Sequence, residues 1–204
     1  AHLGDADSIV VDPHKHGLQP YGCGCVLFRD PAVGRFYKHE SPYTYFTSSE
    51  LHLGEISLEC SRPGASATAL WATQRLLPLV RGGEFAKGLM KSRQASLKLF
   101  DKVSADSRFL AIMPPELDIL VWAPAGESAS RISALSERIF ENAAREDLHL
   151  AVFKYPAKLL KTLWPDVTFD EDWVTCLRSC LMKPEHDDWS DRIWSIIERT
   201  AEGL

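Results

Sequence analysis

One lysine in the sequence, Lys15, has the setting of a reactive amine. It follows a run of β-branched residues at positions 9–11 (IVV), which predicts a short buried strand that ends at Pro13. A histidine flanks the lysine on each side, and Gly17 marks a turn. An ammonium group that is desolvated, or that lies near another cation, loses its proton more readily and can then attack a carbonyl carbon. The segment therefore predicts a nucleophilic lysine at the end of a strand.

The residues around Lys15 resemble the lysine segment of the group II amino-acid decarboxylases, enzymes that use pyridoxal 5'-phosphate (PLP). This family contains glutamate, tyrosine and aromatic amino-acid decarboxylases, and sphingosine-phosphate lyase is a close relative. The resemblance starts at residues 12–15 (DPHK) and continues through 17–20 (GLQP), 22–25 (GCGC) and 26–29 (VLFR). Two later blocks also resemble the family, at residues 57–66 (SLECSRPGAS) and 176–180 (CLRSC).

The resemblance implies roles for three residues at the turn. Lys15 forms the Schiff base with PLP, the one expected cofactor, and can then carry a proton. His14 matches a histidine that contacts the cofactor phosphate, where an imidazole N–H can donate to the anion. Asp12 matches a position that also reaches the phosphate. Because a carboxylate repels a phosphate dianion, a second interpretation stays open, in which Asp12 only bonds to the backbone of its own turn.

Two further segments carry residues that the resemblance assigns to the active site of a neighbouring subunit. In residues 41–46 (SPYTYF), Tyr43 fits the loop tyrosine that donates the proton replacing the lost carboxylate, and Tyr45 is the second choice. Either may instead be a packing residue. Ser61 and Gly64 are candidates for a phosphate contact at a helix N-terminus, and Arg62 for organising the turn. A plain helix cap is the alternative for these three residues.

Metal chemistry has weaker support in the sequence. Asp12, His14 and His16 alternate along the chain, but no third ligand with suitable spacing is evident beside the histidines. Cys23 and Cys25 lack a second cysteine pair, so small buried cysteines between glycines explain them better. We therefore expect no metal site.

The spacing of apolar residues predicts an α/β chain. Helices are expected over residues 65–80, 84–105, 129–145 and 187–201, and strands over 23–29, 109–113, 117–123, 148–154 and 174–182. Apolar faces are expected on two of the helices, and these comprise Phe85, Leu89, Leu97, Phe100 and Val103, and Trp189, Ile193, Trp194, Ile196 and Ile197. The resulting small domain has helices on one face of a mainly antiparallel sheet. Arg178 in its last strand is a candidate for holding a substrate carboxylate.

With the resemblance, this pattern implies the C-terminal part of a fold type I PLP-dependent enzyme. Residues 1–82 form the end of the large PLP-binding domain, residues 83–105 a connecting helix, and residues 106–204 a small C-terminal α/β domain. The chain has no initiator methionine and runs at once into the lysine strand. We therefore expect a longer polypeptide, whose preceding part supplies an aspartate for the pyridine nitrogen and most of the substrate pocket.

The composition excludes several other classes of protein. A net charge of −5 without a basic run argues against nucleic acid, and no apolar run approaches the roughly 20 residues of a membrane span. Five scattered cysteines favour a reducing cytoplasm over a disulfide framework.

The predicted function is PLP-dependent decarboxylation of an L-amino acid to an amine and CO₂, by a homodimer acting on a small-molecule substrate. Two alternatives remain: a PLP-dependent carbon–carbon lyase on a phosphorylated amino alcohol, and a non-catalytic fragment that needs its N-terminal part. We expect the isolated fragment to be inactive, and its sequence does not identify the amino acid.

Overall fold

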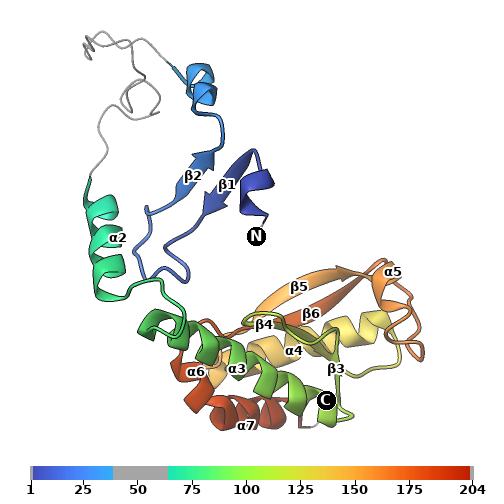
Figure 1. Ribbon diagram of the computed structural model, residues 1–204. Helices are drawn as coiled ribbons and strands as arrows, with labels where there is room; N and C mark the ends of the chain where they lie inside the picture. Colours follow the sequence, from blue (N-terminus) through green and yellow to red (C-terminus); the bar gives the residue numbers. More distant parts are fainter. Residues whose placement is uncertain (1, 39–63, 203–204) are drawn as a thin grey trace, which may run out of the picture. The chain divides into compact units, whose positions relative to one another are not determined.

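The computed structural model describes residues 2–38 and 64–202. The chain divides into two compact units, Ala1–Leu79 and Val80–Leu204 (Figure 1). Four of the residues singled out above lie outside the described residues, namely Tyr43, Tyr45, Ser61 and Arg62. Lys15 belongs to the first unit and Arg178 to the second.

The first unit contains a two-stranded antiparallel ribbon and a helix. Strand β1 (Ser8–Val11) pairs with β2 (Cys25–Phe28), and Ser8 lies opposite Phe28. The 3₁₀ helices η1 (Leu3–Asp5) and η2 (Pro31–Phe36) flank this ribbon in the chain. Helix α2 (Ala65–Leu76) is shorter than predicted, because the residue before Pro78 is disfavoured in helical conformation.

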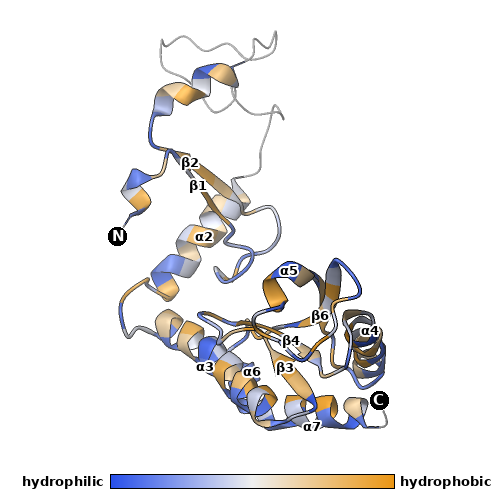
Figure 2. Ribbon diagram, turned by 90° about the vertical axis from the view of Figure 1, so that its right-hand side faces the viewer, coloured by the Kyte–Doolittle hydropathy of each residue, from blue (hydrophilic) through white to orange (hydrophobic). Residues whose placement is uncertain are grey.

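The predicted burial of the lysine strand is wrong for the residues that the structure describes. Val10 in β1 is 69% exposed, and Leu27 in β2 is 56% exposed. Both strands are strongly hydrophobic (Figure 2), as a strand that is covered on both faces would be. A ribbon of only two strands cannot bury its own faces, so the apolar sequence predicts more cover than the described part of this unit supplies.

The second unit is built on a four-stranded sheet with the strand order β3-β4-β6-β5, in which every neighbouring pair is antiparallel. This agrees with the predicted mainly antiparallel sheet. Its strands are β3 (Phe109–Ala111), β4 (Ile119–Pro124), β5 (Ala151–Pro156) and β6 (Trp173–Cys180). Its helices are α3 (Glu84–Ala105), α4 (Ala129–Arg145), α5 (Ala157–Leu160), α6 (Glu185–Asp188) and α7 (Ser190–Ala201).

Alternate residues of the central strands bury opposite faces of this sheet. On one face, Leu120, Trp122 and Leu177 are fully buried in a cluster with residues of α3, α4 and α7. These three helices lie on the same side of the sheet (Figure 1). On the other face, Val174 and Cys176 pack in a cluster that includes Leu160 of the short helix α5. The sheet therefore has a fully covered face and a partly covered one.

Helix α3 has the predicted bounds, and its buried face agrees only in part with the predicted one. Of the expected apolar residues, Val103 is buried, whereas Leu89 is 40% exposed. The buried side chains are mainly small ones, namely Ser92, Ala95, Ser96, Leu99 and Val103. The Ser96 hydroxyl donates to a backbone carbonyl, either that of Arg93 (2.7 Å) or that of Leu117 (2.6 Å), so its burial leaves no polar group unpaired. Hydrophobicity alone predicted this face only in part, because serine and alanine form much of the contact.

The C-terminal helix predicted over residues 187–201 is divided in two. Helix α6 ends before Trp189 and α7 begins at Ser190, whose hydroxyl donates to the carbonyls of His186 (3.1 Å) and Asp187 (2.9 Å). Serine side chains that bond to nearby backbone carbonyls compete with regular helix. Ile193, Ile196 and Ile197 are buried as predicted. Trp189 is 48% exposed, so it does not share the burial that was predicted for this face.

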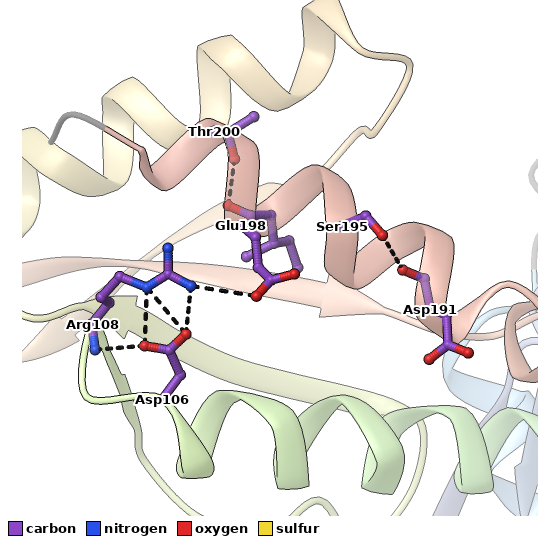
Figure 3. Close-up of polar contacts among 7 residues, drawn as sticks. Asp106, Arg108, Asp191, Ser195, Glu198 and Thr200 are labelled. Carbon is purple, nitrogen blue, oxygen red and sulfur yellow. Dashed lines mark hydrogen bonds and ion pairs between the residues drawn. The ribbon is translucent and has the colours of Figure 1, made fainter.

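An ion-pair cluster joins the end of α3 to α7 (Figure 3). The guanidinium of Arg108 lies 2.6 Å from Asp106 and 3.5 Å from Glu198, and the Arg108 backbone N–H also donates to Asp106 (2.9 Å). The hydrogen bond from the Arg108 side chain lowers the pKa of Asp106 below its ordinary value of 3.8. Asp106 is therefore ionised in the folded protein over the usual pH range.

We expect Asp106→Asn to destabilise the protein by about 0.5–1 kcal/mol at pH 7, the usual range for a partly exposed ion pair. Because the folded pKa of Asp106 is lowered, this contribution is present above pH 3.8 and is lost as the pH falls through the folded pKa. Urea denaturation of both proteins at pH 7 and pH 3 measures the difference, which should shrink at pH 3. Asp101→Asn, an exposed change in α3, is the control and should have no such pH-dependent effect.

The described cysteines are all free, and they differ in their surroundings. Burial in β6 raises the pKa of the Cys176 thiol to about 12, whereas Cys180 at the end of the same strand is exposed. At pH 8 roughly one Cys176 thiol in 10,000 is then a thiolate, the reactive form. We expect iodoacetamide to label Cys180 and to leave Cys176 unmodified until urea unfolds the chain, as peptide mass spectrometry would show. Labelling of Cys176 at the rate of Cys180 in the folded protein would contradict this burial.

Candidate functional site

The chain turns sharply directly after β1, and this turn carries Lys15. Pro13 cannot donate a ladder hydrogen bond, which ends the strand. The Lys15 N–H donates to the carbonyl of Asp12 (3.0 Å), and the Gln19 N–H donates to that of Pro13 (3.2 Å). A Cβ atom at Gly17 would lie only 2.6 Å from the Pro13 carbonyl oxygen. Glycine is therefore required at this position, and the backbone around Lys15 is tightly constrained.

Within this turn, the side chains of Lys15 and Asp12 form an ion pair with a distance of 2.7 Å between Nζ and Oδ2. The Lys15 side chain is 61% exposed and that of Asp12 is 36% exposed. The hydrogen bond from Lys15 is the main cause that lowers the pKa of Asp12, and the charges of Lys15 and His14 add to it. Asp12 therefore serves as the counterion of the lysine in this structure, and the amine lies where a small molecule can reach it.

His14 lies beside a tyrosine that the sequence analysis did not single out. It is half-buried, and its ring centroid is 5.3 Å from that of Tyr21, with an interplanar angle of 32°. His16 is also half-buried. The turn thus holds two imidazoles and an amine within three consecutive residues, a group that can donate several hydrogen bonds to an anion.

Helix α2 lies next to the turn within the first unit. The Gln19 side-chain amide donates to the Thr73 hydroxyl of α2 at 2.7 Å, and the Cys23 thiol lies 3.7 Å from the carbonyl of Ser66. Gln19 is 7% exposed, and its side-chain oxygen is buried without a hydrogen-bond partner among the described residues. Sequence reasoning missed Gln19 because it is one polar residue within a motif whose other positions carry the resemblance.

Gly64 begins α2 from an exposed position. Its carbonyl accepts hydrogen bonds from the backbone N–H (3.0 Å) and the hydroxyl (3.1 Å) of Thr68, which start the helix. Gly64 does not need a left-handed conformation, and a Cβ there would meet nothing within 4 Å. The structure therefore places Gly64 at the helix N-terminus that the sequence predicted, in the same unit as Lys15.

Arg178 lies in the middle of β6, opposite Val121 of β4 and Ala151 of β5. Its side chain is half-buried on the partly covered face of the sheet, and its Nε is buried with no hydrogen-bond partner among the described residues. A buried guanidinium nitrogen without a partner is costly. This position therefore suits an anion that the described residues do not supply.

The described residues contain neither a metal-binding cluster nor a membrane-spanning helix. No group of three or more histidine, cysteine, aspartate or glutamate side chains there could hold a metal ion. None of the helices in residues 2–38 and 64–202 is long and apolar enough to cross a membrane.

Comparison with solved structures identifies the class of fold. The model superposes on Oryza sativa TDC with PLP and tryptamine with a TM-score of 0.74 at 15% identity, covering 96% of this chain and 39% of that one. Mouse CSAD in its apo form gives a TM-score of 0.70 at 16% identity, covering 98% of this chain and 40% of that one. The fold is that of part of a PLP-dependent decarboxylase, as the sequence predicted.

Comparison of sequences adds the family, although no family model matches the chain. An L-tyrosine decarboxylase of Enterococcus faecium is 26% identical over 157 residues, which cover 71% of this chain and 26% of the relative. A probable L-tyrosine/L-aspartate decarboxylase of Methanothermobacter thermautotrophicus is 32% identical over 120 residues, 59% of this chain and 30% of the relative. The chain is therefore similar to part of these tyrosine and aspartate decarboxylases, and it spans less than a third of the length of either relative.

We expect Gly17→Ala to destabilise the lysine turn by more than about 1 kcal/mol, since the new methyl group would collide with the Pro13 carbonyl. Hydrogen exchange of the Gln19 amide, which closes the turn, would then be at least roughly fivefold faster. Gly24→Ala is the matched control, because a Cβ there meets nothing within 4 Å. Equal Gln19 exchange rates in the two variants would show that the turn tolerates a side chain at position 17.

Proposed function

We propose that this chain contributes the cofactor lysine of a PLP-dependent amino-acid decarboxylase, a carboxy-lyase that converts an L-amino acid to an amine and CO₂. The observation that carries the proposal is the accessible amine of Lys15, held on a rigid turn within a chain related to amino-acid decarboxylases. The whole protein's activity is proposed from a chain that spans 26% of the first of these relatives.

The residues of the turn fit PLP. The Lys15 amine is 61% exposed, so an aldehyde can reach it, and no bulky side chain closes the turn at Gly17. His14 beside it would donate a hydrogen bond to the phosphate, and we propose the same contact for the N-terminus of α2 at Gly64. Ser61 is proposed for this phosphate from the resemblance alone. When bound, PLP supplies a ring that accepts the electrons left behind as CO₂ departs.

Asp12 has a different role in this proposal from the one that the resemblance suggested. Its carboxylate lies 2.7 Å from the Lys15 amine, which keeps the carboxylate ionised. Asp12 therefore orients the lysine and balances its positive charge. The ion pair must separate before the amine can bond to carbon. Asp12 can then accept a proton from the lysine nitrogen or return one to it. A direct contact between Asp12 and the phosphate is disfavoured by the like charges.

Two further residues have proposed roles. Tyr43 would donate the proton to the carbon from which CO₂ has left, with Tyr45 as the second choice, and this rests on the resemblance. Arg178 is proposed to bind a carboxylate, because its buried Nε lacks a partner among the described residues and a guanidinium binds carboxylates in two-pronged geometry.

The first amino acids to test come from the names of the relatives, L-tyrosine and L-aspartate. We also propose that the protein acts as a homodimer in the cytoplasm, since the family's loop and phosphate contacts come from a partner subunit.

We expect borohydride to fix PLP covalently to Lys15 of the full-length protein, as mass spectrometry of the Lys15 peptide would show. Lys15→Ala should abolish this adduct and reduce the release of CO₂ from the preferred amino acid by at least about 10³-fold, the usual scale for losing a nucleophile. Lys87→Ala, an exposed lysine of α3, is the control.

Three outcomes of this experiment bear on the proposal. An adduct at Lys15 together with CO₂ release supports it. An adduct without CO₂ release, but with cleavage of a phosphorylated amino alcohol, would replace it by the carbon–carbon lyase. The absence of any adduct at Lys15 in the full-length protein would indicate a fold without this chemistry.

A further inference from the structure

The second unit contains a cavity of about 310 Å³ that the decarboxylase proposal does not use. It lies between the segment at residues 147–150, the end of β6 and the first turns of α6 and α7. Twelve side chains line it, and they come from both apolar and charged residues. Its volume is at the lower end of the range for small-molecule sites, so a ligand of modest size would fill it.

The floor of this cavity is buried and mostly apolar. Leu181 is 4% exposed and Ile196 is 7% exposed, and both line the cavity together with Ile193. Ser179 also lies in the floor, and its hydroxyl already accepts a hydrogen bond from the Trp122 indole (3.0 Å). The floor therefore offers apolar contact with few polar demands of its own.

The rim of the cavity carries two opposite charges that do not pair with each other. Asp147 and Arg192 are both exposed and both line the cavity. Neither side chain forms a hydrogen bond or an ion pair with any residue of the described chain, whereas nine ion pairs do form elsewhere in it. A ligand that carries both charges could bring an anionic group to Arg192 and a cationic group to Asp147 at once.

The position of Asp147 is fixed by the backbone. It follows the end of α4 in left-handed conformation, with a φ of 60°, and the next residue's N–H closes the turn on the Ala143 carbonyl (2.9 Å). Glycine and asparagine are preferred at such helix ends, and aspartate is tolerated there. The carboxylate is thus presented at the rim from a rigid point of the chain.

Three other side chains define what the site would accept. Trp189 is 48% exposed and forms a wall of the cavity. Its ring lies 5.9 Å from that of His186, whose Nδ1 accepts from the Lys183 N–H at 3.4 Å. His149 also lines the cavity. This wall suits a flat or branched apolar group and adds no formal charge when the imidazoles are neutral.

We propose that this cavity binds an apolar α-amino acid in its zwitterionic form. The carboxylate pairs with Arg192, the ammonium group pairs with Asp147, and the side chain lies against Trp189 and the isoleucines of α7. The site is separate from Lys15 in the sequence and needs neither PLP nor decarboxylase activity. It would give the protein a second place to bind an amino acid.

The test uses Cys180, an exposed thiol that lines the same cavity, as a reporter. L-Phenylalanine is the probe, and the 204-residue chain is alkylated with iodoacetamide without PLP. Peptide mass spectrometry follows Cys180 alone. We expect L-phenylalanine to slow the alkylation of Cys180 at least fivefold, with half of the effect at a concentration on the order of 1 mM, as for a small ligand in an open pocket.

Matched ligands and variants separate the two charges. 3-Phenylpropionate lacks the ammonium group and phenylalaninamide lacks the carboxylate, so each should protect Cys180 at least about tenfold more weakly than L-phenylalanine. Arg192→Gln should remove the advantage of L-phenylalanine over phenylalaninamide. Asp147→Asn should remove its advantage over 3-phenylpropionate and keep the turn, since asparagine suits this conformation. Arg138→Gln, an exposed change in α4 outside the cavity, is the control and should leave protection unchanged.

Several results would overturn the proposal. These are no protection of Cys180 by L-phenylalanine at 20-fold above about 1 mM, equal protection by all three ligands, and protection that survives both Arg192→Gln and Asp147→Asn. Lys15→Ala should leave the protection intact. This separates a failure of the second site from a failure of the decarboxylase proposal.

Discussion

The lysine turn depends on one close approach of the backbone, between Gly17 and the carbonyl of Pro13. A Cβ at position 17 would lie 2.6 Å from that oxygen, closer than real Cβ atoms approach. The same carbonyl accepts the Gln19 N–H, and Gln19 in turn reaches Thr73 of α2. One contact thus sets the path of the chain after β1, the position of Lys15 on it, and the place of the helix beside it. The chemistry proposed for Lys15 requires this rigidity, because an amine that must attack one carbon atom needs a backbone that holds it in a fixed position.

The second unit is held together by core packing and a few buried hydrogen bonds. Its sheet buries large side chains such as Trp122 and Leu177, while α3 approaches it with serine and alanine. The small side chains allow a close approach of the helix. The hydroxyl of Ser96 can donate a hydrogen bond to the carbonyl of Leu117, in the loop before β4. The buried indole N–H of Trp122 is likewise paired with Ser179 at 3.0 Å. The core is therefore apolar in bulk, yet its few polar atoms determine how α3 and β6 are placed.

The sequence predicted the long helices well, because periodicity acts over many residues. The bounds of α3 and α4 agree with the predicted ones, and the strands agree to within a few residues. The prediction failed where the decisive contacts were tertiary or local. Hydrophobicity placed Leu89 inside, although Ser92 and Ser96 form the contact, and it ran one helix through Trp189, where Ser190 bonds back to the preceding turn.

For the site, the motif around Lys15 gave the resemblance to decarboxylases but could not show the ion pair with Asp12, the tilted contact between the rings of His14 and Tyr21, or the hydrogen bond of Gln19 to α2. Each of these depends on side-chain geometry that spacing does not encode. Lys15 and Asp12 are three residues apart at a turn, so their contact follows from the fold of the turn rather than from a helical or strand period.

Asp147 occupies a backbone conformation that aspartate does not prefer. At a φ of 60° after a helix, glycine would avoid the steric cost of a Cβ, and asparagine would keep a polar side chain without charge. Aspartate has the Cβ cost and also places an unpaired negative charge near the C-terminus of α4, where the helix dipole disfavours it. Both effects oppose stability, and no side chain of the described residues forms an ion pair with Asp147 to offset them. A ligand ammonium group at the cavity rim would offset them, which connects the left-handed conformation of Asp147 with the cavity that this residue lines.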